Sequence, residues 1–360
     1  MKRILFLSDI NSPHTQKWVS GLASQGFMMG VFSLTPSQTN WYKHLPNVLL
    51  LNESTISKKT FTAGIYGKLQ YLSLLPQLKK VVKSFKPNLL HANYASSYGL
   101  LGALLNFKPF IITVWGSDVF DFPQNHFINR SILKYNLRKA DVIVSASKIM
   151  CSETAKYTNT QVIHIPFGID ANVFVPSVTK SNRLLIGTIK RLEYIYGVDI
   201  LIKAFALIAD KVSADLLIVG NGVSMNQYRT LAKSLNIESR VKFTGWIPHE
   251  QTLQYHQMIN IFVAVSRRES FGVAVLEASA CGNPVLVSNA GGLPEVVANQ
   301  ITGIIVEPDD VTATANALLQ LCNDAALRNS MGQAGRKFVI KHYNWPDNLM
   351  QMVQLYNQYV

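Results

Sequence analysis

The sequence predicts an α/β protein of two doubly wound, Rossmann-like domains that face a central cleft. Three observations support this prediction: the length of the chain, the alternation of strand and helix patterns, and a break in that alternation near the middle. With 360 residues, 48% hydrophobic and 15% charged, the chain can form two domains with separate cores. Doubly wound sheets bind ligands beyond the carboxyl ends of their strands, where two facing domains leave a cleft.

Short apolar runs alternate with helical patterns along the chain, as in parallel sheets covered by helices on both faces. Strands are expected at residues 4–8, 29–33, 88–92, 110–114, 142–146, 162–165, 184–189, 215–219, 241–244, 261–264, 285–288 and 303–306. Helices are expected at residues 15–25, 68–85, 97–106, 197–209, 224–235, 249–259, 273–280, 294–298 and 312–323.

Pro and Gly residues interrupt the alternation at 166–176, which is therefore predicted to connect the domains. We expect a first domain at 1–170 and a second at 171–343. The segment 344–360 has apolar residues at helical spacing: Leu349, Met352, Val353 and Tyr356. It is expected to form a helix that crosses the interdomain joint, and a surface helix of the second domain is the alternative.

Positive charge is concentrated in the first half of the chain. Residues 1–170 hold 18 Lys and Arg against 7 Asp and Glu, a charge of +11, whereas residues 171–360 carry +2 of the total of +13. This excess indicates an anionic partner, for which nucleic acid, an anionic membrane surface and a phosphorylated acceptor all qualify. A solvated basic face without a partner is the alternative.

The cysteines and the apolar runs indicate the compartment. Cys151, Cys281 and Cys322 lack the spacing of a zinc site, and their odd number argues against a disulfide framework, so a reducing compartment is expected. The N-terminal apolar run is too short for a signal peptide, and no run of 18 apolar residues occurs. We expect a cytoplasmic protein whose membrane contact, if any, is peripheral on the inner face.

Two glutamates flank the expected start of a helix in the second half. Glu269 follows a predicted strand, and Glu277 lies inside the helix expected at 273–280. Ser270 can cap this helix, and Gly272 lets a ligand approach the backbone closely. Because free amides at a helix N-terminus bind anions, a diphosphate can sit here with a carboxylate on either side to accept hydrogen bonds from hydroxyls.

The segment ESFGVAVLEASACGNPV at 269–285 resembles the E-x7-E motif of the family 4 retaining glycosyltransferases, which have the GT-B fold. The segments NAGGLPEVV at 289–297 and GIIVEP at 303–308 resemble the same family. GNG at 220–222 and FTGWI at 243–247 fit its donor-domain pattern. The resemblance covers the second half of the chain, and the N-terminal segments look most like bacterial enzymes that build capsule, lipopolysaccharide or related surface glycans.

The resemblance implies that the second domain binds a nucleotide-sugar donor. Glu269 would contact sugar hydroxyls near the reacting carbon, and Glu277 the ribose hydroxyls of the nucleotide. The other donor-binding residues it implies surround the diphosphate and the base: Phe271, Gly272, Val273, Trp246, Ile247, Gly220 and Asn221. For Phe271 and Val273, ordinary packing at the helix start is the alternative.

The cations beside the diphosphate depart from the family pattern, which has an Arg followed five residues later by Lys-Gly. Arg191 stands where the family has its Arg, but Tyr196 replaces the Lys before Gly197. A leaving diphosphate develops negative charge, so a cation is expected to stabilise it. We predict that Arg191 and Lys190 share this role beside Glu269, since Tyr196 can donate only a neutral hydrogen bond.

The first domain is expected to bind the acceptor. Ser12 and His14 follow the first expected strand, at the edge where such sheets bind ligands. Either Ser12 or Thr15 is expected to cap the next helix, and His14 to face the cleft, with a structural role for His14 as the alternative. His91 lies near the end of the strand expected at 88–92 and is expected to be structural rather than catalytic.

Trp115 stands where the family often has a His that contacts the donor sugar. We expect Ser117, Asp118 or a backbone carbonyl to take over that contact. Trp115, Ser117 and Asp118 lie just past the strand expected at 110–114.

A basic amphipathic segment is expected at 68–86, divided at Pro76. Its leucines, valines and phenylalanine alternate with five lysines. Such a segment can lie on an anionic membrane. A core-packed helix with a solvated basic face is the alternative.

The sequence therefore predicts a retaining hexosyl- or N-acetylhexosaminyltransferase that moves a sugar from a nucleotide-diphosphate donor, by family a UDP-sugar, to a sugar or lipid-linked sugar. No cofactor or metal is expected, because the sequence has no Asp-x-Asp pair and no cluster with metal-ligand spacing. No nucleic-acid recognition motif occurs. The alternatives are a nucleotide-sugar epimerase or a glycogen-type transferase on the same fold, and a catalytically weak, membrane-attached partner of another transferase.

Overall fold

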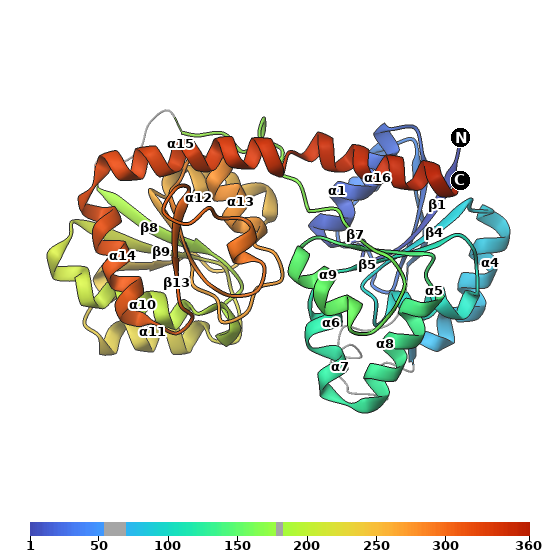
Figure 1. The fold of residues 1–360 in the computed structure, drawn as a ribbon, viewed down its shortest axis with the longest axis horizontal. Helices are drawn as coiled ribbons and strands as arrows, with labels where there is room; N and C mark the ends of the chain where they lie inside the picture. The colour runs from blue at the N-terminus through green and yellow to red at the C-terminus, as the bar shows by residue number, and fades with distance from the viewer. Residues whose placement is uncertain (54–69, 178–182) are drawn as a thin grey trace. The chain divides into compact units, whose positions relative to one another are not determined.

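The computed structural model describes residues 1–53, 70–177 and 183–360, and the chain forms two compact units (Figure 1). The first unit comprises Met1–Phe167 and Asp347–Val360, and the second comprises Gly168–Pro346. The chain passes from one to the other inside the connection expected at 166–176. Each unit holds one sheet, and this architecture is the predicted pair of doubly wound α/β domains.

The first unit is built on a seven-stranded sheet in the order β3-β2-β1-β4-β5-β6-β7, with every pairing parallel. Its strands are β1 (Arg3–Leu7), β2 (Met28–Ser33), β3 (Val48–Glu53), β4 (Leu89–Asn93), β5 (Phe110–Val114), β6 (Val142–Ser145) and β7 (Val162–His164). The strand order reverses between β1 and β4. In such sheets ligands bind at this reversal, beyond the carboxyl ends of the strands.

The helices of the first unit connect these strands. They are α1 (Pro13–Ser24), α4 (Leu75–Phe85), α5 (Tyr98–Leu105), α6 (Ser117–Phe120), α7 (Phe122–Asn125), α8 (Phe127–Lys139) and α9 (Lys148–Ala155), with 3-10 turns η1 (Trp41–His44) and η2 (Gln70–Leu74). Parallel strands need such crossover connections, so the many helices follow from the sheet.

The second unit repeats the same winding with six strands in the order β10-β9-β8-β11-β12-β13, again all parallel. The strands are β8 (Leu184–Ile189), β9 (Ala214–Val219), β10 (Val241–Phe243), β11 (Ile261–Ala264), β12 (Val285–Ser288) and β13 (Gly303–Val306). The order reverses between β8 and β11. The sequence predicted four of these strands with the bounds observed.

The helices of the second unit are α10 (Val198–Ile208), α11 (Met225–Ser234), α12 (Thr252–Met258), α13 (Val273–Ala280), α14 (Val311–Asn323) and α15 (Ala325–His342). The 3-10 turns are η3 (Tyr194–Tyr196), η4 (Ala209–Lys211), η5 (Glu238–Arg240), η6 (His249–Gln251) and η7 (Leu293–Glu295). Figure 1 shows α10 and α11 on one side of the strands and α12, α13 and α15 on the other.

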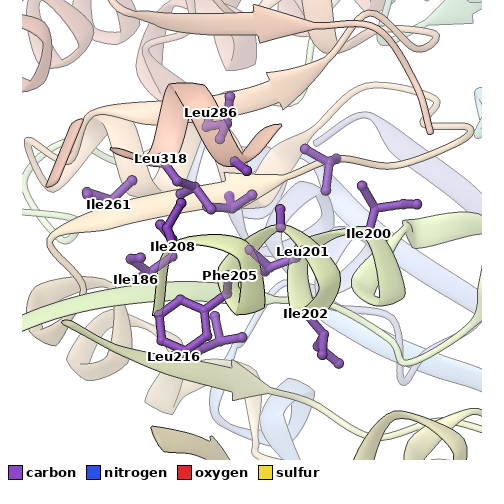
Figure 2. Close-up of a cluster of buried hydrophobic side chains, with 14 of the residues drawn as sticks. Ile186, Ile200, Leu201, Ile202, Phe205, Ile208, Leu216, Ile261, Leu286 and Leu318 are labelled. Carbon is purple, nitrogen blue, oxygen red and sulfur yellow. The ribbon is translucent and has the colours of Figure 1, made fainter. Parts of the chain in front are cut away.

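The core of the second unit lies between α10 and the sheet, as Figure 2 shows. Phe205 of α10 lies beside Leu216 of β9, and both side chains are fully buried. Ile186 of β8 and Ile261 of β11 belong to the same cluster. The two central strands, whose carboxyl ends carry the candidate site, are thus fixed by apolar packing.

α16 (Trp345–Tyr359) begins in the second unit and belongs to the first from Asp347 onward. Tyr356 is fully buried in the first unit, where its ring meets the edge of Phe27 at a centroid distance of 5.7 Å. Its hydroxyl hydrogen-bonds Nδ1 of His91 on β4. The helical spacing found in the sequence therefore marks the residues that attach this helix to the first sheet.

Several elements were missed by the sequence pattern. The prediction lacks β3, α6 to α9, and α15. β3 is an edge strand whose short apolar run does not alternate. In α15, Gly332 weakens the helical pattern, yet a Cβ there would stand 2.1 Å from the carbonyl oxygen of Gly282. Glycine is needed at this position because the helix packs closely on the turn after α13.

The helix expected at 294–298 is wrong. Only the 3-10 turn η7 forms there. The carbonyl oxygen of Glu295, which would accept a hydrogen bond within a helix, accepts one from the Tyr343 hydroxyl at 2.7 Å instead.

The basic amphipathic segment is partly described, because residues 68 and 69 lie outside the described ranges. The remainder forms η2 and α4, where Leu78, Val81 and Phe85 are buried. The lysines of α4 are exposed. Its apolar face therefore packs inside the first unit. None of the helices in the described ranges is long and apolar enough to cross a membrane.

Candidate functional site

A buried ion pair lies where the second sheet reverses its strand order. Lys190 directly follows β8, and Glu269 follows β11 after a short loop. The Lys190 ammonium donates to the Glu269 carboxylate, and the two side chains are only 10% and 11% exposed. The structure thus brings together two of the three predicted catalytic residues, at the position where ligands bind in such sheets.

Glycines let neighbouring loops approach this pair. Gly220 follows β9 with φ +132°, and a Cβ there would stand 1.9 Å from the carbonyl oxygen of Lys190. Gly291 follows β12 with φ +55°, and its Cβ would stand 1.8 Å from the carbonyl oxygen of Glu269. Gly220, predicted to bind the donor, therefore has a packing reason to be glycine: it fixes the backbone of Lys190.

The third predicted catalytic residue lies apart from the pair. The Arg191 side chain is 74% exposed and binds Glu193 at 2.6 Å. Tyr196 instead packs beside the pair, with its ring centroid 5.2 Å from the Lys190 ammonium. Burial raises the pKa of Tyr196 above its ordinary value, so the ring faces Lys190 as a neutral phenol.

At the start of α13, a glycine without a side chain lets a ligand come close to the backbone. Gly272 occupies the N-cap position with φ +109°, two residues beyond Ser270, so the helix begins later than the predicted cap at Ser270 requires. The first helical hydrogen bonds run from the amides of Val275 and Leu276 to the Gly272 carbonyl. The amides of Val273 and Ala274 precede them, as an anion site requires. The Phe271 side chain is buried and packs edge-on against Tyr343, as the packing alternative expects, and the contact of its amide with a diphosphate stays a prediction.

Glu277 is clamped between two histidines that the sequence did not reveal. Glu277 as a whole residue is 4% exposed. Its Oε1 lies 3.1 Å from Nε2 of His249, and its Oε2 lies 3.1 Å from Nε2 of His256. Burial alone would raise the pKa of Glu277, but the hydrogen bonds and charges of the two histidines outweigh burial and lower it to about 2.

A general rule could have found these histidines. A carboxylate inside an apolar helix must be partnered. His249 and His256 are the histidines of the preceding turn η6 and helix α12, and α12 packs beside α13.

The predicted base-pocket residues lie on the loop before η6. Trp246 is 73% exposed, and Ile247 is partly buried. Asn221 lies in the turn after β9, and its side-chain oxygen accepts a hydrogen bond from the Gly222 amide at 2.8 Å.

In the first unit, aromatic rings gather beyond β1 and β5. His14 of α1 stacks on Phe167 at 4.4 Å, and its ring meets that of Trp115 edge-on at 5.8 Å. The indole N–H of Trp115 is buried and has no hydrogen-bond partner in the described ranges. Ser12 holds the N-cap position of α1, but its side chain makes no cap hydrogen bond, and Thr15 instead bonds Ser8 at 2.6 Å. The expected side-chain cap is therefore wrong.

Asp118 and Ser117 stabilise the loop after β5. Asp118 is fully buried and accepts hydrogen bonds from the amides of Ala95, Trp115 and Gly116 at 2.7, 3.0 and 2.8 Å. Burial raises the pKa of Asp118, against the effect of these amides. Ser117 bonds the hydroxyl of Tyr94 at 2.6 Å. Asp118 thus holds a loop and is not open to a ligand.

His91 is structural, as expected. It is 1% exposed and bonds Tyr356 and Thr113. Burial lowers the pKa of His91 to about 3, so the ring is neutral. Among the residues that the structure describes, no three His, Cys, Asp or Glu gather as metal ligands would.

Family comparisons agree with this geometry. Residues 171–338 match the family of group 1 glycosyl transferases, and residues 3–147 match the glycosyl transferase 4-like family. The chain is 27% identical over 316 residues to the N-acetyl-alpha-D-glucosaminyl L-malate synthase of Bacillus anthracis, a match that covers 82% of each chain.

Solved structures share the whole architecture. Sucrose-phosphate synthase from Thermosynechococcus elongatus is 23% identical, with 99% of each chain covered and a TM-score of 0.86. The Anabaena protein HepE, solved in complex with UDP and glucose, is 16% identical, with 99% of this chain and 100% of that chain covered and a TM-score of 0.80. These likenesses show the fold.

The protein is a glycosyltransferase with the GT-B fold. It belongs to the group 1, family 4-like glycosyltransferases, as the resemblance around Glu269 and Glu277 implied.

Proposed function

We propose that the protein is a retaining glycosyltransferase that moves a hexosyl or N-acetylhexosaminyl group from a nucleotide-diphosphate donor to an acceptor hydroxyl. The observation that carries this proposal is the buried Lys190–Glu269 pair, which lies where the second sheet reverses its strand order. There a carboxylate that can hold sugar hydroxyls and a cation that can hold phosphate meet in surroundings shielded from water.

The proposed reaction is a front-face displacement. The acceptor oxygen bonds to the anomeric carbon on the face from which the diphosphate leaves. The bond between that carbon and the diphosphate oxygen breaks, and the hydroxyl proton passes to the leaving phosphate oxygen. Negative charge develops on the diphosphate, so Lys190 and the free amides at the start of α13 stabilise the transition state.

The donor contacts divide between the two glutamates. Glu269 orients the sugar through its hydroxyls, and Glu277 accepts hydrogen bonds from the ribose. Trp246 and Ile247 line the base. UDP is the proposed nucleotide, and the complex of the Anabaena relative with UDP and glucose supports trying it first. No cofactor or metal is needed in this scheme.

The acceptor is proposed to bind the first unit, as a sugar or lipid-linked sugar in bacterial surface glycan biosynthesis such as that of capsule or lipopolysaccharide. The rings of His14 and Trp115 offer an apolar platform for a sugar. Ser12 lies beside His14 at the start of α1.

Peripheral contact with the inner face of the cell membrane is part of the proposal. Of the two basic helices, α8 fits such a contact better than α4. The apolar face of α4 is buried. On α8, by contrast, Phe127 is 74% and Ile128 39% exposed. The helix sequence FINRSILKYNLRK carries four cations and no acidic residue. An exposed aromatic among cations suits an anionic lipid surface.

Donor binding and transfer test the proposal. Thermal unfolding is measured with UDP, GDP, UDP-glucose, UDP-N-acetylglucosamine and GDP-mannose, because a ligand of the folded state raises Tm. Transfer by wild type and Glu269→Ala is then compared with the identified donor. A loss of about 100-fold or more is expected for Glu269→Ala. Transfer at near wild-type rate would refute the role of Glu269.

Analysis of the reaction products tests two further points: whether the anomeric configuration is retained, and whether the protein is instead a nucleotide-sugar epimerase. Proton NMR early in the reaction must show that the product keeps the anomeric configuration of the donor. Incubation without acceptor addresses a nucleotide-sugar epimerase on the same fold. An epimerised donor would favour that rival, and an unchanged donor would favour transfer.

A further inference from the structure

We propose that His256 and His249 are positioning residues that make the second unit selective for nucleoside diphosphates with an intact ribose. They act by holding the carboxylate of Glu277, one at each oxygen. The inference rests on the proposed function, in which Glu277 binds the ribose of the donor.

The direction of both hydrogen bonds follows from chemistry. An ionised carboxylate only accepts, so each histidine must donate from Nε2. The pKa of Glu277, lowered to about 2, keeps this carboxylate ionised at neutral pH. Each donor fixes one oxygen, and together they fix the plane of the carboxylate.

His256 is the immobile half of the clamp. Its side chain is fully buried in α12, and its ring packs against Phe262 at 5.3 Å and Phe174 at 6.0 Å. Its carbonyl oxygen accepts a hydrogen bond from the buried Asn283 side chain at 2.7 Å. Its Nδ1 has no hydrogen-bond partner in the described ranges. The hydrogen bond from Nε2 to Glu277 is therefore the only one that this ring makes in the described ranges.

His249 is the accessible half. Its side chain is 48% exposed, whereas that of Glu277 is 5% exposed. It lies in η6, directly after the loop of Trp246 and Ile247 that is proposed to hold the base. The clamp therefore links the loop that is proposed to hold the base to the helix that carries Glu277.

The clamp leaves capacity for two hydroxyls. Two carboxylate oxygens offer about four lone-pair sites, and the histidines use two. The remaining two match the vicinal 2′ and 3′ hydroxyls of a ribose. A deoxyribose lacks one of them and leaves a buried acceptor unpaired, which is how such sites discriminate. A free carboxylate could rotate and would lose this selectivity.

The test compares UDP with 2′-deoxy-UDP, and GDP with 2′-deoxy-GDP, by calorimetric titration of the full chain. Wild type is expected to prefer the ribonucleotide roughly tenfold or more. His256→Phe keeps the ring packing but removes the donor, and its preference should fall below about threefold. His256→Gln replaces Nε2 by an amide donor and should restore the preference. His342→Ala, an exposed histidine at the end of α15, is the matched control and should behave as wild type.

The outcomes separate the clamp from the role of Glu277. If Glu277→Gln loses the preference while His256→Phe and His249→Ala keep it, the clamp is refuted and the ribose contact stands. If Glu277→Gln keeps the preference, the ribose contact of the proposed function fails, and the clamp with it. If His256→Phe does not fold, the exposed His249→Ala decides: an unchanged preference refutes the clamp. If wild type binds no nucleotide or shows no preference, the inference is overturned.

Discussion

Lys190 and Glu269, which lie 79 residues apart in the sequence, form an ion pair with both side chains about nine-tenths buried. Their strands, β8 and β11, are neighbours in the sheet although β9 and β10 come between them in the chain. The pairing therefore depends on the crossover of the doubly wound sheet. Each charge compensates the other away from water, so the pair is also a structural element.

Removing one partner of this pair should destabilise the fold. Lys190→Met leaves a carboxylate uncompensated in surroundings of low polarity, and we expect the free energy of unfolding to fall by about 3 kcal/mol. The double variant Lys190→Met/Glu269→Gln should recover most of this loss and still lack transfer activity. Urea unfolding of the two variants checks this. Equal stability of Lys190→Met and wild type would show that the ion pair does not contribute to the free energy of unfolding.

A cation at position 196 should strengthen phosphate binding. Tyr196 lies beside Lys190, and the resemblance places a Lys at this position. Tyr196→Lys is expected to lower the Kd for the nucleoside diphosphate by about tenfold, and the gain should shrink at high salt. Arg191→Ala is expected to change Kd less than threefold, because Arg191 is exposed and paired with Glu193. Titration at two salt concentrations measures both, and a larger loss in Arg191→Ala would restore Arg191 to the phosphate site.

Adding a methyl group at Gly291 should be costly, because its Cβ would stand 1.8 Å from the carbonyl oxygen of Glu269 at φ +55°. We expect Gly291→Ala to lower the free energy of unfolding by roughly 2–4 kcal/mol and to reduce transfer. Gly282→Ala is the matched control in the same unit: its φ is +74°, but its nearest neighbour would be Pro176 at 3.4 Å. That change should cost only about 1 kcal/mol. Similar losses in both variants would mean that the contact with Glu269 is unimportant.

The sequence predicted what is local and missed what depends on packing. The Glu269–Glu277 segment could be predicted because it is continuous in the sequence, on the loop after β11 and the helix α13 that follows. The partners of those glutamates could not. Lys190 was expected near phosphate, but its pairing with Glu269 needs the strand order. His249 and His256 reach Glu277 only because α12 packs on α13.

The prediction of helix α15 and the role predicted for Asp118 failed for related reasons. α15 contains Gly332, which has a low helix propensity. Glycine is needed there because the helix backbone lies close to the carbonyl oxygen of Gly282. Asp118 has the appearance of a ligand-binding carboxylate in sequence. Only its three amide partners show that it holds the loop after β5.

The stability of the protein should depend on the ionisation of Glu277. Its pKa is lowered from an ordinary 4.5 to about 2, so the folded state holds the charged form more favourably than the unfolded chain does. This stabilisation is complete above about pH 4.5 and is lost as the pH falls towards 2, with a size of roughly 3 kcal/mol. Urea unfolding from pH 7 to 3 should show wild type losing more stability than Glu277→Gln. Parallel curves would contradict the lowered pKa.

The proposed membrane contact predicts which basic helix touches lipid. Wild type is expected to sediment with vesicles that contain anionic phosphatidylglycerol and to stay in solution with neutral phosphatidylcholine. Phe127→Ser should reduce the bound fraction several-fold, because Phe127 is the exposed aromatic of α8. Ile301→Ser, a 64% exposed apolar residue of the second unit, is the matched control and should change nothing.

Charge variants separate α8 from α4. Replacing Arg130, Lys134 and Arg138 of α8 by Gln should weaken binding further than replacing Lys79, Lys80 and Lys83 of α4, because α8 also carries the exposed Phe127 whereas the apolar face of α4 is buried. Each lost cation near an anionic surface is worth about 1 kcal/mol, so a triple change should remove most of the bound protein. If the α4 variant loses more, the basic face of α4 makes the contact by charge alone. Equal recovery of wild type with neutral and anionic vesicles would rule out an electrostatic contact at either helix.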